Sequence, residues 1–409
     1  METLFKRYLK GDTTLWVVFL ALCILSIIEM YSASSTLAYK ASNHAMPVIR
    51  HVGFLTGGVI IAFIVHMIPY RWIRIVSYFG LFLSAILLVF VLFKGHSEND
   101  AARWLVIGGI QFQPSELAKL SVIIVAADLI SRIRDNSKEE WIYFRNTIIM
   151  LIGICGLILL ENFSTAAILF IVVFIMMFIG RISMKYLGSL AGILLIALLL
   201  GYGAVKTIPE NSMPKAFKRA YTWVARIERH SDKGGAKENK YVINDKNRQE
   251  IYGQIAIARG RVFGVGPGNS VERDYLPQAY SDFIYSIIVE EMGLIGGILV
   301  IILYLILLFR AGRIVMNCAA VFPAILVMGL SLMIVLQTFI NMSVATSLIP
   351  VTGQPLPLIS RGGTSILITC IYFGIILGIT RQIINDQKPI DDAYNSEEEQ
   401  LPVVELESL

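Results

Sequence analysis

The amino-acid sequence predicts an all-α polytopic membrane protein with ten transmembrane helices and a large extracytoplasmic loop between the seventh and eighth helices. The first reason is composition, because 56% of the 409 residues are hydrophobic and only 16% are charged, which is more apolar than a soluble core of this length requires. The second reason is that apolar runs long enough to cross about 30 Å of hydrocarbon recur along the chain. The third is that Lys and Arg are distributed unevenly between the two sides of these runs.

The ten apolar runs are interpreted as membrane spans. In chain order they cover residues 15–31, 54–68, 73–93, 117–133, 147–160, 166–179, 187–206, 282–309, 320–343 and 365–384. No small-residue cleavage site accompanies the first run, so we expect it to be a retained span and not a removed signal peptide.

The cations predict that both termini are cytoplasmic. With the N-terminus inside, the short inner segments hold most of the Lys and Arg residues, as the positive-inside rule requires. These inner cations are Lys6, Arg7, Lys10, Arg71, Arg74, Arg132, Arg134, Lys138, Arg145, Arg181, Lys185, Arg310, Arg313, Arg381 and Lys388. The short outer loops hold only Lys40, Arg50, Lys94, Arg103 and Arg361. The net charge of +5 therefore follows the membrane, and no nucleic-acid partner is expected.

The chain divides into a ten-helix membrane domain, residues 1–385, and an acidic cytoplasmic tail, residues 386–409. The tail has too few bulky side chains to fold alone, so we expect it to be disordered. Within the domain, the extracytoplasmic loop covers residues 207–281 and is too long to be a mere connector. It contains helix-like stretches at 214–228 and 247–258, and then the glycine-rich piece GRVFGVGPGNS at 260–270. The glycines suit tight turns that return the chain to the membrane. The alternative is a backbone nest for a phosphate, but the strand that nucleotide-binding motifs need is missing.

Cysteine and histidine are not spaced like metal ligands. The four cysteines lie in or beside apolar runs, so we expect free thiols. The five histidines form no ligand-like pair, so no metal site is predicted. The motifs G-x-S-x-G, H-E-x-x-H and the Walker lysine are also missing, which argues against serine hydrolysis, zinc hydrolysis and NTP-driven pumping.

Polar residues gather at the outer end of the fourth span, in ARWLVIGGIQFQPSELAKL (102–120). This piece contains Arg103, Gln113, Ser115 and Glu116, and Lys119 shares a helix face with the last two. We expect these side chains to point toward one outer cavity. The structural alternative is that Glu116 and Lys119 neutralise each other as an i,i+3 pair.

Carboxylates mark the stretch YLPQAYSDFIYSIIVEEMG (275–293). Asp282 lies at the outer end of the eighth span, where the helix dipole favours a carboxylate. Glu290 and Glu291 would lie about 12 to 14 Å deeper on a straight helix, so they cannot share one reacting atom with Asp282. We interpret both glutamates as buried structural groups, partnered or protonated. Lys119 and Asp128 of the fourth span also need partners, because ionisable groups inside a membrane are costly.

The piece IPVTGQPLPLISRGGTS (349–365) follows Gln337 and Asn341 of the ninth span and cannot be helical, because prolines and glycines interrupt it. A re-entrant or interfacial loop that lines a cavity is predicted, with an architectural and not a catalytic role. The concentrated polar chemistry is thus outer, both acidic and basic, and at the bilayer edge. A lipid-linked substrate with a charged head group would suit it.

At these residues the sequence resembles the SEDS family (shape, elongation, division and sporulation), which comprises the FtsW, RodA and SpoVE group of bacterial peptidoglycan polymerases. The resemblance rests on 102–120, on GVGPGNSVERDYLPQAYSDFIYSIIVEEMGLIG and on FINMSVATSLIPVTGQPLPLISRGGTS, in that order. It implies a multi-pass glycosyltransferase of the bacterial cytoplasmic (inner) membrane that polymerises lipid II outside, with undecaprenyl-pyrophosphate-linked glycan as the growing chain. The implied partners are a class B penicillin-binding protein and other divisome or elongasome membrane proteins.

The resemblance also assigns roles to residues. Asp282 matches the proposed catalytic acid of the family's T-D-F element, with Ser281 in place of threonine. Lys119 matches the lysine of P-S-E-x-x-K, Arg103 belongs to the arginine-tryptophan motif, and Asp274 matches the acid before aromatic-Leu-Pro. Substrate-binding or supporting roles are expected for Lys119, Arg103, Glu116, Ser115, Gln113, Asp274 and Gln249.

The sequence departs from the family pattern at three places. Ala102 replaces a common arginine, Arg361 stands where tyrosine is common, and ENFSTA (161–166) replaces a Pro-Asp-x-Gly-Thr element. These departures concern the cavity wall and not the reaction class. The phrase FINMSVATSLIPVTG and the acidic tail are more similar to the division member FtsW than to RodA.

The chemistry that the resemblance implies is attack of the acceptor sugar's 4-hydroxyl on the anomeric carbon of a chain linked to undecaprenyl pyrophosphate. Asp282 is the expected base, with Lys119 nearby, and Arg103, Arg248 or Arg261 would bind the diphosphate. No cofactor is required by the sequence, although Mg²⁺ or another divalent cation could share that work. The alternatives are a lipid II flippase, a RodA-type elongation polymerase and a non-enzymatic scaffold that recruits the penicillin-binding protein.

Overall fold

The computed structural model describes residues 10–33, 46–94, 96–98, 101–107, 110–135, 139–208, 218–231, 243, 247–276 and 279–398. Each predicted span corresponds to a helix in these ranges. The helices are α2 (Thr13–Ala33), α4 (Met46–Met67), α5 (Tyr70–Lys94), α6 (Pro114–Asp135), α7 (Glu140–Glu161), α8 (Phe163–Ile179), α9 (Met184–Thr207), α12 (Ile284–Asn317), α13 (Val321–Ala345) and α14 (Thr364–Glu398). Among the described residues, eight of them are long and apolar enough to cross a membrane. The other two are the shorter α8 and the charge-bearing α6, so the polytopic all-α fold is confirmed and the count of ten spans stays a prediction.

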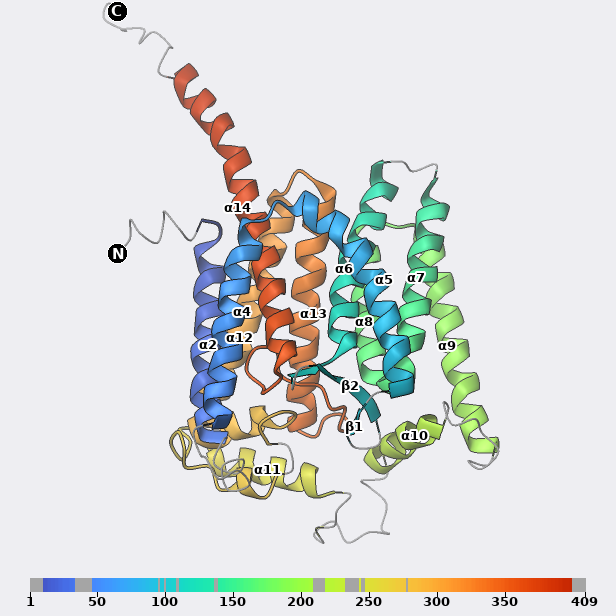
Figure 1. The fold of residues 1–409 in the computed structure, drawn as a ribbon, viewed down its shortest axis with the longest axis vertical. Coiled ribbons are helices and arrows are strands. Elements are labelled where there is room, and N and C mark those ends of the chain that lie inside the picture. The colour runs from blue at the N-terminus through green and yellow to red at the C-terminus, as the bar shows by residue number, and fades with distance from the viewer. Residues whose placement is uncertain are drawn as a thin grey trace, which may run out of the picture.

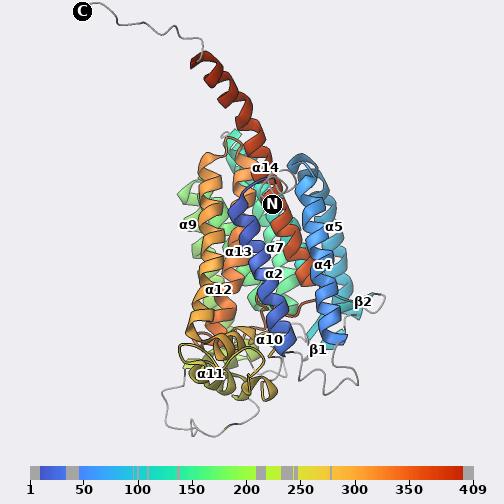
Figure 2. The ribbon, with the colours of Figure 1, turned by 90° about the vertical axis from the view of Figure 1, so that its left-hand side faces the viewer.

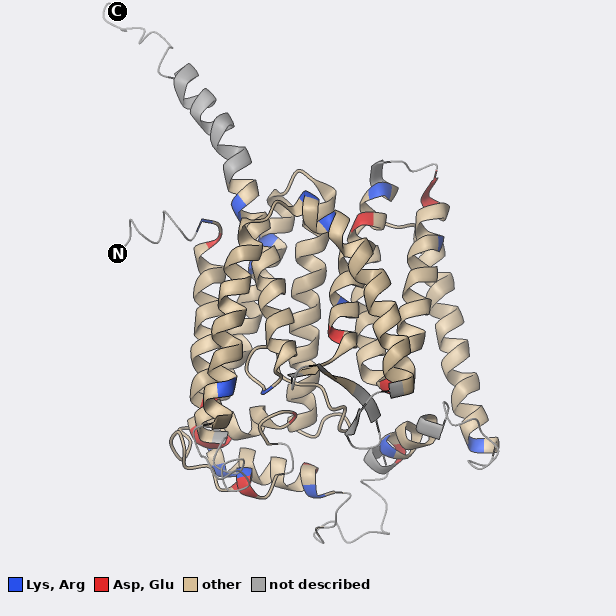
Figure 3. Ribbon diagram, viewed as in Figure 1, with Lys and Arg blue, Asp and Glu red and all other residues tan. Residues whose placement is uncertain are grey.

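The helices form one bundle in which α13 and α14 are central and α9 stands at the edge (Figure 1). Most of α13 and most of residues 364–384 of α14 are buried, whereas almost all of α9 is exposed. The start of α2 and the far end of α14 lie at the same end of the bundle, and the loop helices lie at the other (Figures 1 and 2). Acidic and basic side chains are found mainly at these two ends (Figure 3), as expected for a bundle with an apolar belt.

The end opposite the termini contains structure that the sequence predicted only in part. The expected loop helices are present as α10 (Lys218–Ser231) and α11 (Arg248–Gly260), followed by the short 3-10 helix η5 (Glu272–Asp274). A small antiparallel sheet was not expected. Its strands are β1 (His96–Glu98), β2 (Ala101–Ile107) and β3 (Ile110–Phe112), with Leu105 of β2 opposite Phe112 of β3.

Helix α12 is broken at Gly293, where the backbone has φ +70° and ψ −172°. A continuous helix of 34 residues would be about 51 Å long, well beyond about 30 Å of hydrocarbon. At the break the amides of Leu294 and Ile295 donate to the carbonyls of Arg261 and Val262 at 2.9 and 3.3 Å. This close approach requires glycine, because a Cβ at Gly293 would lie 2.2 Å from the carbonyl oxygen of Val262. The first nine residues of α12 therefore form a separate helical segment before the long apolar one.

Asp128 of α6 has the partners that the sequence required. Its carboxylate, which is fully buried, accepts hydrogen bonds from the Tyr78 hydroxyl at 2.5 Å and from Arg132 at 3.0 Å, and it pairs with Arg74. This cluster joins α5 to α6 and is structural.

The backbone of α14 continues as a helix past the predicted domain boundary at residue 385 to Glu398, and residues 399–409 lie outside the described residues. Low apolar content prevents a segment from packing as a domain, but it does not prevent the backbone from extending an existing helix. The disordered cytoplasmic tail stays a prediction.

Candidate active site

A cavity of about 550 Å³ lies at the end of the bundle opposite the start of α2, on the side of the sheet and the loop helices. Its wall includes residues of α4, β2, β3, the start of α6, α10 and α11, the turn before α12, and the loop 349–363. Asp282 lines it, as do Gln113, Glu116 and Gln249. Segments that are far apart in the sequence therefore converge where the family resemblance placed a substrate site.

Asp282 belongs to a turn that is held by its backbone. The helix begins at Ile284, so Asp282 precedes the first helical turn of α12 by two residues. Its carbonyl accepts a hydrogen bond from the Asn341 side chain at 2.9 Å, and its carboxylate accepts one from the Ser281 hydroxyl at 2.9 Å. The two preceding carbonyls accept from the Ser360 hydroxyl at 2.6 Å and from the Arg361 amide at 2.9 Å. These hydrogen bonds to main-chain carbonyls fix the position of the segment.

The helix-broken segment 349–363 lines the cavity, as predicted. Buried side chains of the bundle hold its carbonyls: Gln337 donates to Pro355 at 3.1 Å, and Asn341 to Gln354 at 2.8 Å. The Gln354 side chain donates in turn to the Thr165 hydroxyl at 2.8 Å. Thr165 belongs to the piece that departs from the family pattern, so that piece supports the loop.

Lys119 and Glu116 form the i,i+3 ion pair that was the structural alternative, with 2.7 Å between Nζ and Oε1. Lys119 is almost fully buried, and it also donates to Gln337 at 3.2 Å. Its expected contact with Asp282 is not found among the contacts of the described residues. Glu116 is thus a cavity residue whose charge is already matched by Lys119.

The other predicted site residues differ in whether they lie near the cavity. Ser115 is buried beside the cavity, and its hydroxyl has no partner among the described residues. Arg103 lies in β2 with its side chain outside the described residues, although Trp104 beside it lines the cavity. Asp274 does not reach the cavity: it is 54% exposed and pairs with Arg273 at 3.6 Å.

The cations that line the cavity are Arg50, Arg226 and Arg361. Arg226 of α10 donates to the Val351 carbonyl at 3.0 Å, and Arg361 lies over the Tyr280 ring at 5.2 Å. Sequence reasoning missed this set as a site. A signal existed for Arg50 and Arg361, because both lie in short outer loops that the positive-inside rule leaves poor in cations.

Two of the three arginines that were expected to bind a diphosphate lie elsewhere. Arg248 stacks over Tyr252 at 5.9 Å, and Arg261 belongs to a separate surface beside Arg259. Neither is among the residues that line the cavity.

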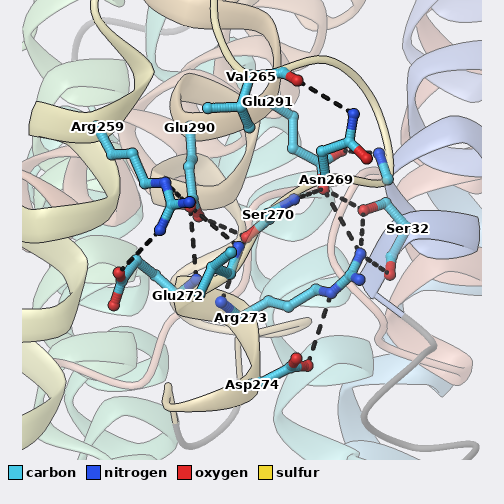
Figure 4. A network of polar contacts seen from close by, with 12 residues as sticks. Ser32, Arg259, Val265, Asn269, Ser270, Glu272, Arg273, Asp274, Glu290 and Glu291 are labelled. Atoms are coloured by element: carbon cyan, nitrogen blue, oxygen red, sulfur yellow. Dashed lines mark hydrogen bonds and ion pairs between the residues drawn. The ribbon is translucent and has the colours of Figure 1, made fainter.

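Glu290 and Glu291 are fully buried and partnered, as predicted, but their position differs from the prediction (Figure 4). The Ser32 hydroxyl, in the last turn of α2, donates to Glu291, and Ser270 of the outer loop donates to Glu290 at 2.5 Å. They therefore lie at the same end of the bundle as the last turn of α2 and the loop, and not farther along it. Depth had been counted along one straight helix, but the break at Gly293 separates residues 284–292, which carry both glutamates, from the long apolar segment, so the two segments do not share one axis.

The glycine-rich turns supply most of the remaining donors. Backbone amides of Gly268 and Ser270 donate to Glu291 at 3.0 and 3.3 Å, and those of Val271 and Glu272 donate to Glu290 at 3.1 and 3.4 Å. The anion in this backbone nest is thus the protein's own carboxylate pair, and the structure supports the tight-turn interpretation.

Two arginines complete the network in Figure 4. Arg259 lies 3.7 Å from both Glu290 and Glu272, and Arg273 lies 3.8 Å from Glu291. Burial and the neighbouring Glu290 raise the pKa of Glu272 above its ordinary value of 4.5, and Arg259 opposes this effect. The network joins α2, α11, the loop and α12.

Comparison with known proteins agrees with this architecture. A family model described as "Cell cycle protein" (FtsW, RodA, SpoVE) matches residues 12–384. The chain belongs to the FtsW/RodA/SpoVE family. Relatives within it include a probable peptidoglycan glycosyltransferase FtsW of Hahella chejuensis, 31% identical over 91% of each chain, and one of Bacillus subtilis, 30% identical over 92% of each chain.

Two solved structures share the fold of this FtsW/RodA/SpoVE member. A chain from a structure titled as a peptidoglycan synthase complex that coordinates polymerization and crosslinking has a TM-score of 0.68, with 23% identity over 91% of this chain and 98% of that chain. The rod shape determining protein RodA of Thermus thermophilus has a TM-score of 0.61, with 23% identity over 91% of this chain and 97% of that chain.

Proposed function

We propose that the protein is a peptidoglycan glycosyltransferase that polymerises lipid II at the outer face of the bacterial cytoplasmic membrane, for division wall synthesis. The observation that carries the proposal is the cavity, which combines a carboxylate on a fixed turn, Asp282, with three guanidinium groups. The names of the curated relatives support the reaction class, and their FtsW type supports the division role.

In the proposed reaction Asp282 accepts the proton of the acceptor sugar's 4-hydroxyl as that oxygen attacks the anomeric carbon. The bond from this carbon to the diphosphate oxygen breaks, and undecaprenyl diphosphate leaves. A base on a rigid turn is useful because the reacting atoms must be aligned to within a few tenths of an ångström.

The cavity charge favours the leaving group. Arg50, Arg226 and Arg361 line the wall, while Glu116 is neutralised by Lys119. Guanidinium groups bind phosphate oxygens in a bidentate way, so this wall would stabilise the negative charge that develops as the diphosphate departs.

A divalent ion is not needed for this account, and the described residues of the wall do not fit one. Its two carboxylates are Asp282 and Glu116, Glu116 is paired with Lys119, and no group of three or more possible ligands is found among the described residues.

Topology and partners follow from the same proposal. The cavity lies at the end of the bundle opposite the start of α2 and the end of α14 (Figure 1), so cytoplasmic termini place it outside. We propose a class B penicillin-binding protein as the partner, with other division proteins around it. The similarity to a chain of a peptidoglycan synthase complex supports this.

The test is polymerisation of purified lipid II by the full-length chain, with and without a co-purified class B penicillin-binding protein. Asp282→Asn should abolish glycan product while the protein still inserts and binds the partner, and Asp274→Asn is the matched control because its side chain is outside the cavity. Full activity of Asp282→Asn would refute the assignment.

The same vesicles distinguish the flippase alternative, which predicts movement of lipid II across the bilayer without polymer. The structure gives this alternative little support, because the intramembrane charges Lys119 and Asp128 are engaged by partners within the bundle.

A further inference from the structure

The cavity wall contains a histidine that the proposed chemistry does not use. His51 lies on α4 one turn after Pro47 and one turn before Phe54, and all three line the cavity. The residue is 3% exposed. The charge of a buried imidazole, and the nitrogen that carries its proton, decide which hydrogen bonds the ring can form with a molecule in the cavity.

The hydrogen bonds of Ser26 define the tautomer of His51. The Ser26 hydroxyl lies 2.7 Å from the Leu358 carbonyl oxygen, which can only accept, so the hydroxyl proton is directed there. The same oxygen of Ser26 lies 2.8 Å from Nε2 of His51. Because the hydroxyl has one proton and has already donated it, Nε2 must be the donor in this second bond. The lone pair of the neutral ring is then on Nδ1.

The backbone around Leu358 is fixed in the conformation that directs its carbonyl at Ser26. Leu358 is buried and has φ +67°, a left-handed conformation that non-glycine residues rarely adopt. The Tyr304 hydroxyl holds the neighbouring Pro357 carbonyl at 2.5 Å. The loop is thus fixed in a shape that directs the Leu358 carbonyl at Ser26.

Nδ1 of His51 has no hydrogen-bond partner among the described residues, and the ring lines the cavity. Nδ1 is not one of the fully buried polar atoms that lack a partner, so it is accessible from the cavity. A molecule bound there can therefore donate a hydrogen bond to it.

The surroundings indicate the class of donor. Arg50 and Arg361 line the same cavity, so a carboxylate at position 51 would compete with a diphosphate for the guanidinium groups. A neutral imidazole accepts a hydrogen bond without adding negative charge. Sugar hydroxyls and the amide N–H of an N-acetyl group are donors of this kind.

We propose that His51 is a sugar-recognition residue, whose Nδ1 accepts a hydrogen bond from a hydroxyl or amide N–H of the lipid-linked saccharide while Ser26 fixes its tautomer. This inference rests on the proposed function, since it assumes a saccharide substrate in the cavity.

Two conservative variants separate recognition from a structural role. In His51→Asn the amide oxygen occupies the position of Nδ1 and keeps the cavity acceptor, but the bond to Ser26 is lost. In His51→Gln the amide nitrogen reaches the position of Nε2 and keeps the bond to Ser26, but the cavity acceptor is lost. Recognition predicts that His51→Gln weakens lipid II binding about tenfold, whereas His51→Asn stays within about threefold of the parent.

Binding is measured on the full-length chain in the Asp282→Asn background, so that no turnover occurs, with purified lipid II as the probe. Initial polymerisation rates of the single variants give a second readout, in which His51→Gln should raise KM for lipid II and leave kcat within about twofold. The opposite order, with His51→Asn weaker than His51→Gln, would mean that the bond to Ser26 alone matters and would overturn the proposal. Equal binding by both variants and the parent would overturn it as well.

The two proposals can fail separately. If the wild-type chain binds lipid II without making polymer, the glycosyltransferase proposal fails, and the binding order of the variants still decides the role of His51. If the wild-type chain makes polymer and His51→Gln matches it in KM, only the role of His51 is refuted.

Discussion

The glycine-rich turn that holds Glu290 and Glu291 contains two glycines with the same backbone requirement and different surroundings. Gly264 has φ +78° and Gly268 has φ +85°. A Cβ on Gly264 would lie 2.1 Å from the Glu291 carbonyl oxygen, whereas a Cβ on Gly268 would meet nothing within 4 Å. The pair Gly264→Ala and Gly268→Ala therefore separates the cost of the close approach from the cost of the conformation.

The magnitudes follow from the contacts. Placing Ala at positive φ costs about 1 to 2 kcal/mol at either position. At Gly264 the backbone must also move away from α12, which breaks the bonds from Val265 to the Glu290 carbonyl at 3.0 Å and from Gly266 to the Glu291 carbonyl at 2.9 Å. Each is worth about 1 kcal/mol. We expect about 1 to 2 kcal/mol for Gly268→Ala and about 3 to 4 kcal/mol for Gly264→Ala.

Amide hydrogen exchange of residues 264–272 measures this local opening in the full-length protein. Exchange should accelerate about 5- to 30-fold in Gly268→Ala and at least about 150-fold in Gly264→Ala, since 1.4 kcal/mol corresponds to a factor of ten. Protection of the buried helix α13 should not change in either variant. Acceleration by the same factor in both variants would refute the reasoning, because the packing of Gly264 against α12 would then contribute nothing.

Two further predictions concern charges. Glu116→Gln leaves Lys119 buried without its anion and should destabilise the protein by about 3 kcal/mol or more. Glu228→Gln is the control and should cost less than about 1 kcal/mol, because the side chains of its ion pair, Lys206 and Glu228, are 54% and 44% exposed. Thermal unfolding in detergent compares the two variants, and equal shifts in melting temperature would contradict the burial argument. Arg361→Ala should raise KM for lipid II about tenfold or more, because a charge-assisted hydrogen bond to the diphosphate is lost. Arg248→Ala is the control and should leave KM unchanged, because Arg248 does not line the cavity. An equal rise in KM in both variants would argue against a specific site.

The helices could be predicted from the sequence because the length of an apolar run is a local property. The start of α12 illustrates both the success and its limit. The predicted start, residue 282, is two residues from the observed one at Ile284. The break at Gly293 was not predicted, because a glycine in an apolar run is compatible with a continuous helix, and only the approach of Val262 makes the break necessary. The positions of Glu290 and Glu291 depended on that break.

The site was predictable where the residues that form it share one segment. Glu116 and Lys119 are three residues apart, so their pairing was one of two interpretations, and the structure selects it. Arg226 could not be found in this way. It reaches the cavity from α10, which lies in the long loop and has no sequence relation to α4 or to segment 349–363. Convergence of this kind is decided by tertiary packing.

The acids at the cavity end of the bundle differ in how they are held, and this difference bears on which one can act as a base. The side chain of Glu116 is held by Lys119, and those of Glu290 and Glu291 are held by backbone amides and arginines. The segment that carries Asp282 is fixed through its main chain, because three hydrogen bonds end on the carbonyls of residues 280, 281 and 282. A carboxylate that is positioned by its backbone can gain and lose a proton without losing the bonds that position it, which is what a general base must do in each cycle. The sequence had placed Lys119 near this base, and the structure pairs Lys119 with Glu116 instead.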